Sequence, residues 1–494
     1  MRPGVNITTR ENALPPSVPT DVGTCFMIGV TESGPLTLTS QDVVTNMDEY
    51  TDKWAYTGRA YANAVTMYDS AELFFREGGS RLFVGRVVGA AAVVATIAVQ
   101  DASAATVWTA NAKGPGDWGN DLNVVITTTT ENPNIPAGNY HIQVKTDGGV
   151  ILEESYDLPN KAAGTAWAVT SQYINLVDGA SANNPKAGTS SLAGGLLDAA
   201  SIADANWQTA LDRFPLDLGP GIVCGPGRTT TAGQVQLAKH AEAKTRVAFL
   251  DGPNTPTVAT LKAAPAGVID VSGKRSRYSG MFAPWVVIPG LTVSSTRTVP
   301  PSPAVAGKFA RNVSFGLSPN EPAAGDNGIF NSVLSVTQTY IDSDRQALND
   351  AGVDIIRDQY GVRKVYGWRT CADPLNDRKW INLGNSILHR AIAAQAGAVG
   401  EGYVFKQIDG QNRLINDFGA TLVGEVCLPL FLSGSLYGAT PTDAYSVDVG
   451  PSVNTPTTIA NNELHAVISV RMAPFGEEVD IEIVKYLVTE TIPA

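Results

Sequence analysis

Apolar and polar residues alternate at both ends of the chain, which predicts extended strands there. At the C-terminal end, Val479, Ile481 and Ile483 are separated by Asp480 and Glu482. This period of two is typical of a strand with one buried face. No hairpin turn follows, so the predicted strand needs a partner edge elsewhere in the molecule or on a neighbouring one.

The N-terminal end has the same pattern. Val5 and Ile7 alternate with Asn6 and Thr8, and the proline-rich stretch 14–19 follows before any core-like segment appears. Such a stretch gives the end of the chain reach, with little conformational freedom to lose on binding. We therefore expect residues 1–20 to form an extended arm that contains a strand.

Between the two ends, the hydrophobic pattern predicts a discontinuous α/β core domain over residues 21–89 and 193–365. Helical spacing at 60–76 and 230–245 separates short apolar runs of the kind found in buried parallel strands. These predicted strands lie at 25–30, 81–89, 221–227, 246–253 and 281–290. In the first helix, the expected buried stripe comprises Tyr61, Ala64, Val65, Tyr68, Glu72 and Phe75.

Residues 90–192 have a different character and predict an inserted, sandwich-like antiparallel β domain. Their apolar runs, including 166–177, are short, rich in β-branched residues and bounded by turn residues, and 147–149 reads Asp-Gly-Gly, a hairpin turn. The remaining region, 366–494, is expected to be an α+β domain with a long helix at 377–400, ending in the C-terminal strand.

Composition narrows the possible functions. Of the 494 residues, 44% are hydrophobic and 17% are charged, so the chain is globular and long enough for several cores. A net charge of −12 argues against direct nucleic-acid binding as the main role. The sequence contains no run of eighteen apolar residues, the length that a membrane-spanning helix needs, so we predict no membrane insertion. The N-terminal residues do not resemble a secretion signal.

None of the candidate chemical motifs meets the requirements of a functional site. The stretch Gly114–Gly119 fits the spacing of a dinucleotide-binding fingerprint, but a predicted strand follows it where the fingerprint needs a helix. No phosphate loop and no catalytic triad are present. We therefore predict no catalytic, cofactor or metal site. The four histidines lack metal-ligand spacing, and the four isolated cysteines are expected to be buried, reduced thiols, which fits synthesis in the cytoplasm: His141, His240, His389, His465, Cys25, Cys224, Cys371 and Cys427.

Several segments, in order along nearly the whole chain, resemble the tail sheath proteins of contractile phages and related injection machines. The most specific is VPPSPAVAGKFARNVSFGLSPNEP at 299–322, which is similar to a signature of that family. The stretch GPGDWGNDLNV at 114–124 resembles a family turn, and LNDAGVDIIRDQYGVRKVYGWRT at 348–370 resembles a family strand pair. The helix at 377–400 departs from the family because it lacks the usual basic run and carries only Arg378, Lys379 and Arg390.

The resemblance implies a subtilisin-like α/β core without hydrolase activity, in a protein that polymerises as stacked rings around an inner tail tube and contracts. The expected partners are other copies of the chain, the tube protein, and baseplate and tail terminator proteins, in a virion tail assembled in the host cytoplasm. The ends of one subunit would add strands to its neighbours through Val5, Ile7, Val479, Ile481 and Ile483. The C-terminal region would lie innermost, with a tube-facing set of Arg378, Asn382, His389 and Arg390.

Other interpretations of the same sequence remain. The implied core topology also fits a subtilisin-like hydrolase, and the acidic, glycine- and proline-rich composition also fits a secreted adhesin or surface-layer protein. The C-terminal strand at 479–488 has a simpler alternative as well, in which it pairs with residues 464–472 of its own subunit.

Overall fold

The computed structural model describes residues 21–477 and Lys485. The chain divides into two compact units at Ala398/Val399. The sequence predicts a division at 365/366; beyond that point, Trp368, Leu383 and Ile387 still belong to the apolar core of the first unit. The segment after the last core strands is therefore held by the first unit rather than by the second.

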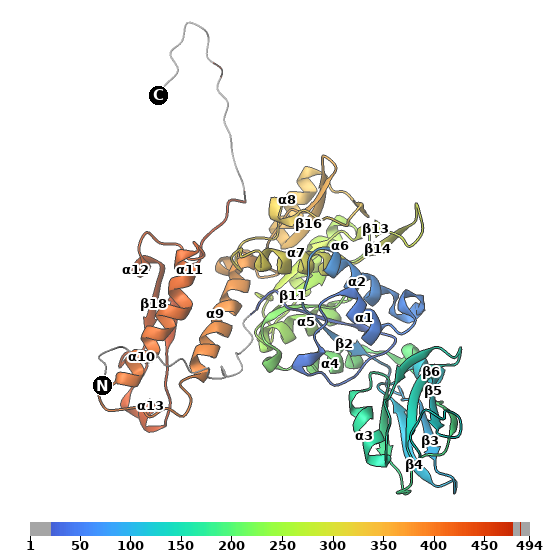
Figure 1. Ribbon diagram of the computed structural model, residues 1–494. Coiled ribbons are helices and arrows are strands. Elements are labelled where there is room, and N and C mark those ends of the chain that lie inside the picture. Colours follow the sequence, from blue (N-terminus) through green and yellow to red (C-terminus); the bar gives the residue numbers. More distant parts are fainter. Residues whose placement is uncertain (1–20, 478–484, 486–494) are drawn as a thin grey trace, which may run out of the picture. The chain divides into compact units, whose positions relative to one another are not determined.

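A seven-stranded sheet forms the centre of the first unit (Figure 1). All neighbouring strands pair in parallel except β16 and β17, which pair antiparallel at one edge of the sheet. Runs of almost entirely buried residues, as in β1, are what a parallel sheet covered on both faces requires. In spatial order the strands are β17 (Val362–Val365), β16 (Val353–Gln359), β12 (Ser279–Ala283), β11 (Arg246–Asp251), β10 (Gly221–Cys224), β1 (Cys25–Val30) and β2 (Leu82–Val87).

Helices cover both faces of this sheet, and the two faces have separate apolar cores. Cys25 and Met27 of β1 belong to one core, whereas Phe26 and Ile28 belong to the other, as the strand period of two dictates. The first core also contains residues of α1 (Met47–Trp54), α2 (Val65–Arg76) and α7 (Ser302–Ser314). The second contains residues of α4 (Asp204–Asp212), α5 (Thr231–Ala243), α6 (Val258–Ala263) and α8 (Asp342–Ala351).

The stripe expected on the first predicted helix is confirmed only in part. Ala64 is buried, and Tyr68 and Phe75 are partly buried against the first core. The fully buried side chains of α2 lie beside this stripe and include Met67, Ala71 and Phe74. Asp69 on the same helix is also buried, and it bonds Arg59 and Arg297.

The predicted strand at 281–290 is in fact two strands in two sheets. Its first half is β12 of the central sheet, and its second half, β13 (Val286–Pro289), pairs with β14 (Thr296–Val299) and β15 (Ser335–Val336). Short 3₁₀ turns complete the first unit, at Ser40–Asp42, Gly58–Ala60, Ala62–Ala64, Asp117–Asp121, Ala199–Ser201, Leu216–Leu218, Ala264–Gly267, Gly325–Gly328 and Arg378–Trp380.

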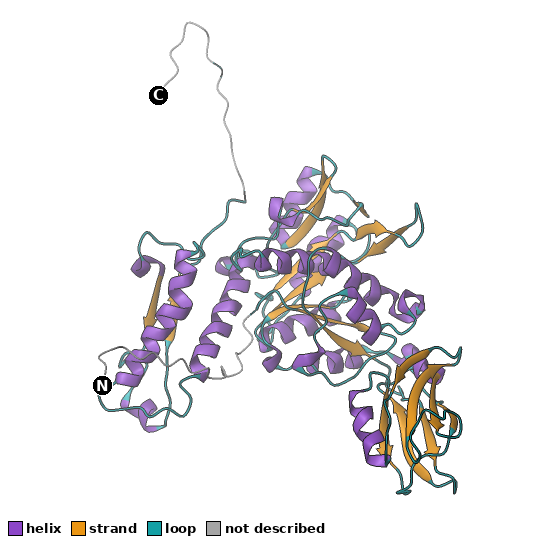
Figure 2. Ribbon diagram, viewed as in Figure 1, coloured by secondary structure: helices purple, strands orange, loops and turns teal. Residues whose placement is uncertain are grey.

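Between β2 and β10 the chain forms two antiparallel sheets (Figure 2). Their side chains share one apolar core with helix α3 (Lys161–Thr170). The predicted strand at 166–177 is wrong in its first half, because Asn160 caps α3 by accepting from the Ala163 amide and a strand begins only at Ile174. The sheets comprise β3 (Thr96–Gln100), β4 (Thr106–Ala112) and β8 (Ile174–Asp178), and β7 (Ile151–Glu154), β6 (Tyr140–Thr146), β5 (Leu122–Thr128) and β9 (Gly188–Ser191).

Helix α9 (Leu383–Glu401) crosses the division between the units. The second unit then contains one long helical stretch and a small antiparallel sheet. Its elements are α10 (Arg413–Leu422), a π-helical turn (Val423–Cys427), α11 (Leu428–Leu432), α12 (Pro441–Ala444), β18 (Tyr445–Asp448), α13 (Pro456–Ala460) and β19 (Val467–Val470).

Candidate functional site

Within the residues that the structure describes, the sheet of the second unit consists of two strands. β18 and β19 pair antiparallel, from Tyr445↔Val470 to Asp448↔Val467. A two-stranded sheet is marginally stable in water unless other elements support it. In this sheet the two strands alternate between half-buried and exposed side chains, so that one face is only partly covered.

The outer edge of β19 is unpaired within the described residues. Arg471, just after β19, donates its amide to the Ala444 carbonyl and accepts from the Tyr437 amide through its own carbonyl. Because the N–H and C=O groups of one residue in an antiparallel strand point to the same side, both partners lie on the β18 side. Among the described residues, therefore, no strand pairs with the opposite edge of β19 or with the outer edge of β18, and both edges have backbone groups that could accept another strand.

The second unit buries few apolar side chains with which to support this sheet. One stripe comes from the long helical stretch and includes Ile415, Phe418, Leu422 and Val426, and Phe431 contacts the ring of Tyr445. The helical stretch Arg413–Leu432 is, by length and composition alone, long and apolar enough to cross a membrane. Its buried stripe is what a helix packed on its own sheet requires.

The predicted inter-subunit strand residues cannot be placed. Val5, Ile7, Val479, Ile481 and Ile483 all lie outside the described residues. The alternative pairing of 479–488 with 464–472 is untested for the same reason, although β19 falls within that second range.

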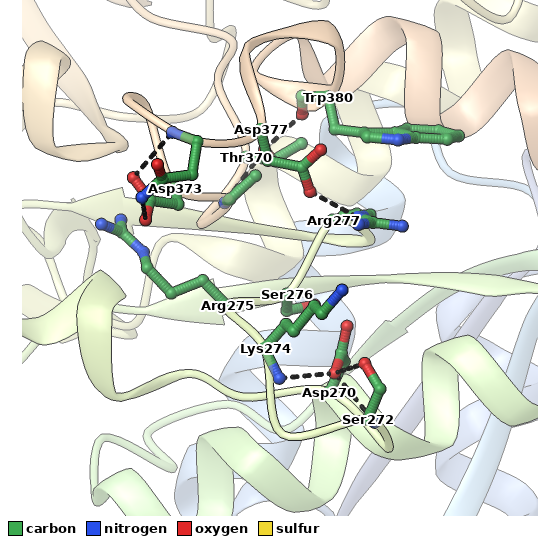
Figure 3. Close-up of polar contacts among 12 residues, drawn as sticks. Asp270, Ser272, Lys274, Arg275, Ser276, Arg277, Thr370, Asp373, Asp377 and Trp380 are labelled. Atoms are coloured by element: carbon green, nitrogen blue, oxygen red, sulfur yellow. Dashed lines mark hydrogen bonds and ion pairs between the residues drawn. The ribbon is translucent and has the colours of Figure 1, made fainter.

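The predicted tube-facing residues lie on the segment before α9 and on the first turns of that helix. A set of polar contacts, here called the charged clasp, fastens this segment to the core (Figure 3). In this clasp, the side chain of Arg277 forms an ion pair with Asp377. Arg275 donates to the Cys371 carbonyl at 2.8 Å, and Thr370 donates to the Trp380 carbonyl at 2.6 Å. Two of these contacts join residues about a hundred positions apart in the sequence, whereas Thr370 and Trp380 are only ten positions apart.

Three of the four predicted tube-facing residues are engaged within their own chain. The Arg390 guanidinium lies 3.5 Å from the ring centroid of Tyr278, and the His389 ring contacts Trp380. Burial lowers the pKa of His389, which favours the neutral ring. Asn382 accepts hydrogen bonds from the amides at the start of α9, whereas Arg378 is exposed. Their contact with a tube stays a prediction.

The described residues contain no arrangement typical of a hydrolase. Asp251, at the carboxyl end of β11, accepts from the amide and hydroxyl of Ser302 at the start of α7, and its burial raises its pKa to about 7. No histidine bonds to either residue; His240, for example, accepts from Arg246 in the opposite core. In the described part of the chain, no group of three or more potential ligands could hold a metal ion.

All four cysteines are buried, free thiols, as the sequence predicted. The Gly114–Gly119 stretch leads through a 3₁₀ turn into β5 rather than into an α-helix, so the prediction that it is a turn is confirmed. The first unit is thus a covered α/β sheet with a β insertion, and the second is a small unit with an open sheet.

Solved structures share this arrangement over nearly its whole length. The sheath tail protein from Listeria innocua is 10% identical, with a TM-score of 0.61 over 92% of this chain and 96% of that one. The sheath tail protein from Desulfitobacterium hafniense is 14% identical, with a TM-score of 0.53 over 90% and 93%. A chain from the contracted sheath complex of the extracellular contractile injection system PVC is 13% identical, with a TM-score of 0.56 over 98% and 97%.

The chain therefore has the fold of contractile tail sheath proteins. No family model and no curated protein matches its sequence. At identities of 10–14% the likeness shows the fold, and functional residues have to be argued from this chain itself.

Proposed function

We propose that this chain is the sheath subunit of a contractile tail or injection machine, and that its activity is self-assembly. The observation that carries the proposal is the two-stranded sheet of the second unit, whose outer edges are free within the described residues. Unpaired edges of this kind promote aggregation of a monomer, whereas in a polymer they allow neighbouring subunits to bind by adding a strand.

The two ends of the chain have the sequence that such edges need. A strand added to β18 or β19 continues the half-buried face formed by Tyr445, Val447, Ile468 and Val470, so it needs apolar residues at alternate positions. Val5 and Ile7 meet this requirement at one end, and Val479, Ile481 and Ile483 meet it at the other.

An end donated to another copy makes a contact between different surfaces of the two subunits, and such contacts propagate into open helices. In this proposal the polymer surrounds an inner tube, is nucleated at a baseplate, and contracts by rotation of whole subunits while the donated strands keep them joined. In this proposal the C-terminal region of the chain faces the tube, and Arg378, which belongs to the first unit, is the most accessible of the predicted contact residues.

Deletion of residues 1–18 tests the proposal. The truncated chain should remain folded and soluble but should form no tubes, whereas the full chain should give hollow, ribbed cylinders in negative-stain electron microscopy. Normal cylinders from the truncated chain would refute the role of the arm.

A pair of matched variants tests the strand itself. Val5→Asp with Ile7→Asp places charge on the face that must be buried, whereas Asn6→Asp with Thr8→Asp adds the same charge to the opposite face. We expect the first variant to abolish tubes and the second to retain them. Equal behaviour of the two variants would show that the arm does not pair as a strand.

A further inference from the structure

A buried arginine joins the inserted β domain to the core. Arg86 of β2 is 1% exposed, and its guanidinium forms no ion pair within the described residues. It donates instead to main-chain carbonyls of the core, at Glu32 (2.7 Å) and Gly34 (2.8 Å). On the other side it donates to the carbonyl of Pro115 in the inserted domain, at 2.6 Å.

Glycine is required where the two domains meet at this arginine. A Cβ atom on Gly114 would lie 2.3 Å from the Gly34 carbonyl oxygen and 2.9 Å from the guanidinium. Gly116 has a φ of +129°, which other residues rarely adopt, and a Cβ atom there would also crowd the guanidinium. The glycines that imitate a nucleotide fingerprint thus allow close approach of two backbones to Arg86.

Further hydrogen bonds connect the turn at 117–121 to the core and to the segment of the chain that returns to the core. Tyr56 of the core donates its hydroxyl to Asp121 at 2.6 Å. Asn120 donates to the Gly195 carbonyl and accepts from the Gly195 amide, which holds the returning segment of the chain. Asp117 accepts from the Leu197 amide on that returning segment as well.

A cavity of about 480 Å³ lies beside the joint. Core residues such as Lys53 form one wall, and Lys113 and Tyr173 of the inserted domain contribute to the other. This cavity interrupts the packing between the two domains, so that direct contact is concentrated at the Arg86 joint and at Tyr56, whose ring contacts Trp118 and Tyr173.

We propose that Arg86 is a positioning residue, which locks the inserted domain in one orientation and makes it a single rigid body with the core. Burial lowers the pKa of Arg86, but the guanidinium remains charged near neutral pH. Its planar fork bonds carbonyls of both domains through two separate nitrogens, and the single compact ammonium of a lysine cannot reproduce that spacing of donors. The proposal is independent of self-assembly, since all of these groups belong to one chain.

Distances between spin labels on the full chain test this proposal. Labels are placed on cysteines introduced at Ala137 in the inserted domain and Lys239 on α5 of the core, both exposed. The native cysteines are at most 1% exposed and so should not compete for the label. The labelled chain is diluted into an excess of unlabelled chain. Pulsed electron–electron double resonance then measures only the distances between two labels within one subunit.

The native chain should give a single narrow distance distribution. Arg86→Lys and, independently, Gly114→Ala should broaden or shift it while circular dichroism stays unchanged. Gly148→Ala is the matched control, because a Cβ atom there meets only the Thr146 hydroxyl at 3.5 Å. If Arg86→Lys fails to fold, Gly114→Ala carries the test. A broad native distribution, or variants indistinguishable from the native chain or from the control, would overturn the proposal.

Discussion

Replacement of Lys308 by methionine should destabilise the core strongly. Lys308 on α7 is 2% exposed, and its ammonium lies 3.2 Å from the carboxylate of Glu77, which is fully buried after the end of α2. The same carboxylate accepts hydrogen bonds from the amides of Asn331 and Ser332, at 2.7–3.1 Å. Methionine preserves most of the lysine volume and removes only the positive charge.

The magnitude follows from the charge that is left behind. Loss of one partner of a buried ion pair costs about 3–5 kcal/mol, because the other charge remains away from water. The two amide donors at Glu77 stay in place and offset part of that cost, so we expect about 3 kcal/mol for Lys308→Met. Glu77→Gln should cost a similar amount, and the double variant should fall short of the sum by at least about 2 kcal/mol.

Urea unfolding of the unassembled chain measures these changes. Trp368 lies beside Phe309 of α7, with ring centroids 6.4 Å apart, so tryptophan fluorescence reports on this core. Hydrogen exchange of the Asn331 and Ser332 amides gives a local reading of the same bonds. The control is Arg76→Met, whose ion pair with Glu72 is 46% exposed on the arginine side and should contribute less than about 0.5 kcal/mol. A loss below about 1 kcal/mol for Lys308→Met, or additive single variants, would refute the reasoning.

Two further predictions follow from other buried or half-buried charges. Burial raises the pKa of Asp251 from 3.8 to about 7, so the folded chain keeps a proton that the unfolded chain releases. The free energy of unfolding should therefore fall as pH rises from about 4 to about 7, by at most about 4 kcal/mol, and Asp251→Asn should flatten this dependence in urea midpoints measured at pH 5 and pH 8. Asp377→Asn should break the partly exposed ion pair with Arg277, cost about 1 kcal/mol, and speed hydrogen exchange in the first turns of α9; unchanged exchange there would mean that the clasp does not hold this helix.

Five strands of the central sheet (β1, β2, β10, β11 and β12) could be predicted from the sequence because each contains a short apolar run. β1, for example, has the predicted bounds, Cys25–Val30. The strands β16 and β17 carry charged residues such as Arg357 and Lys364, and only the family resemblance indicated them. Elements that depend on distant partners could not be predicted in this way. The buried face of α2 is set partly by Arg297, which is 228 positions away from its partner Asp69, and no local periodicity contains that information.

The polar contacts that join distant segments of the chain could not be predicted from the sequence either. The glycines of the stretch Gly114–Gly119 indicate a close approach of two backbones, but the sequence does not say which ones. The fold shows that Arg86 lies between the core and the inserted domain at this point. The clasp at Arg277 and Asp377, like the pair of Glu77 and Lys308, brings together residues that nothing in their local pattern connects. The charged residues at these joints are the ones that a reading of apolar periodicity assigns to solvent.

The central sheet and the small sheet differ in how their edges are closed. At one edge of the central sheet, β2 is covered by a bridge between Val44 and Leu82, and at the other edge a bridge between Ile329 and Lys364 covers β17. Neither outer edge of the β18–β19 sheet has such a cover in the described residues, although buried or half-buried backbone groups normally find partners. The edges of the central sheet are therefore partly occupied, whereas those of the β18–β19 sheet carry unpaired backbone groups within the described residues. In the proposed polymer, a strand added to the small sheet would leave the hydrogen bonds of the central sheet intact while whole subunits rotate, which is the mechanical property that a contracting lattice requires.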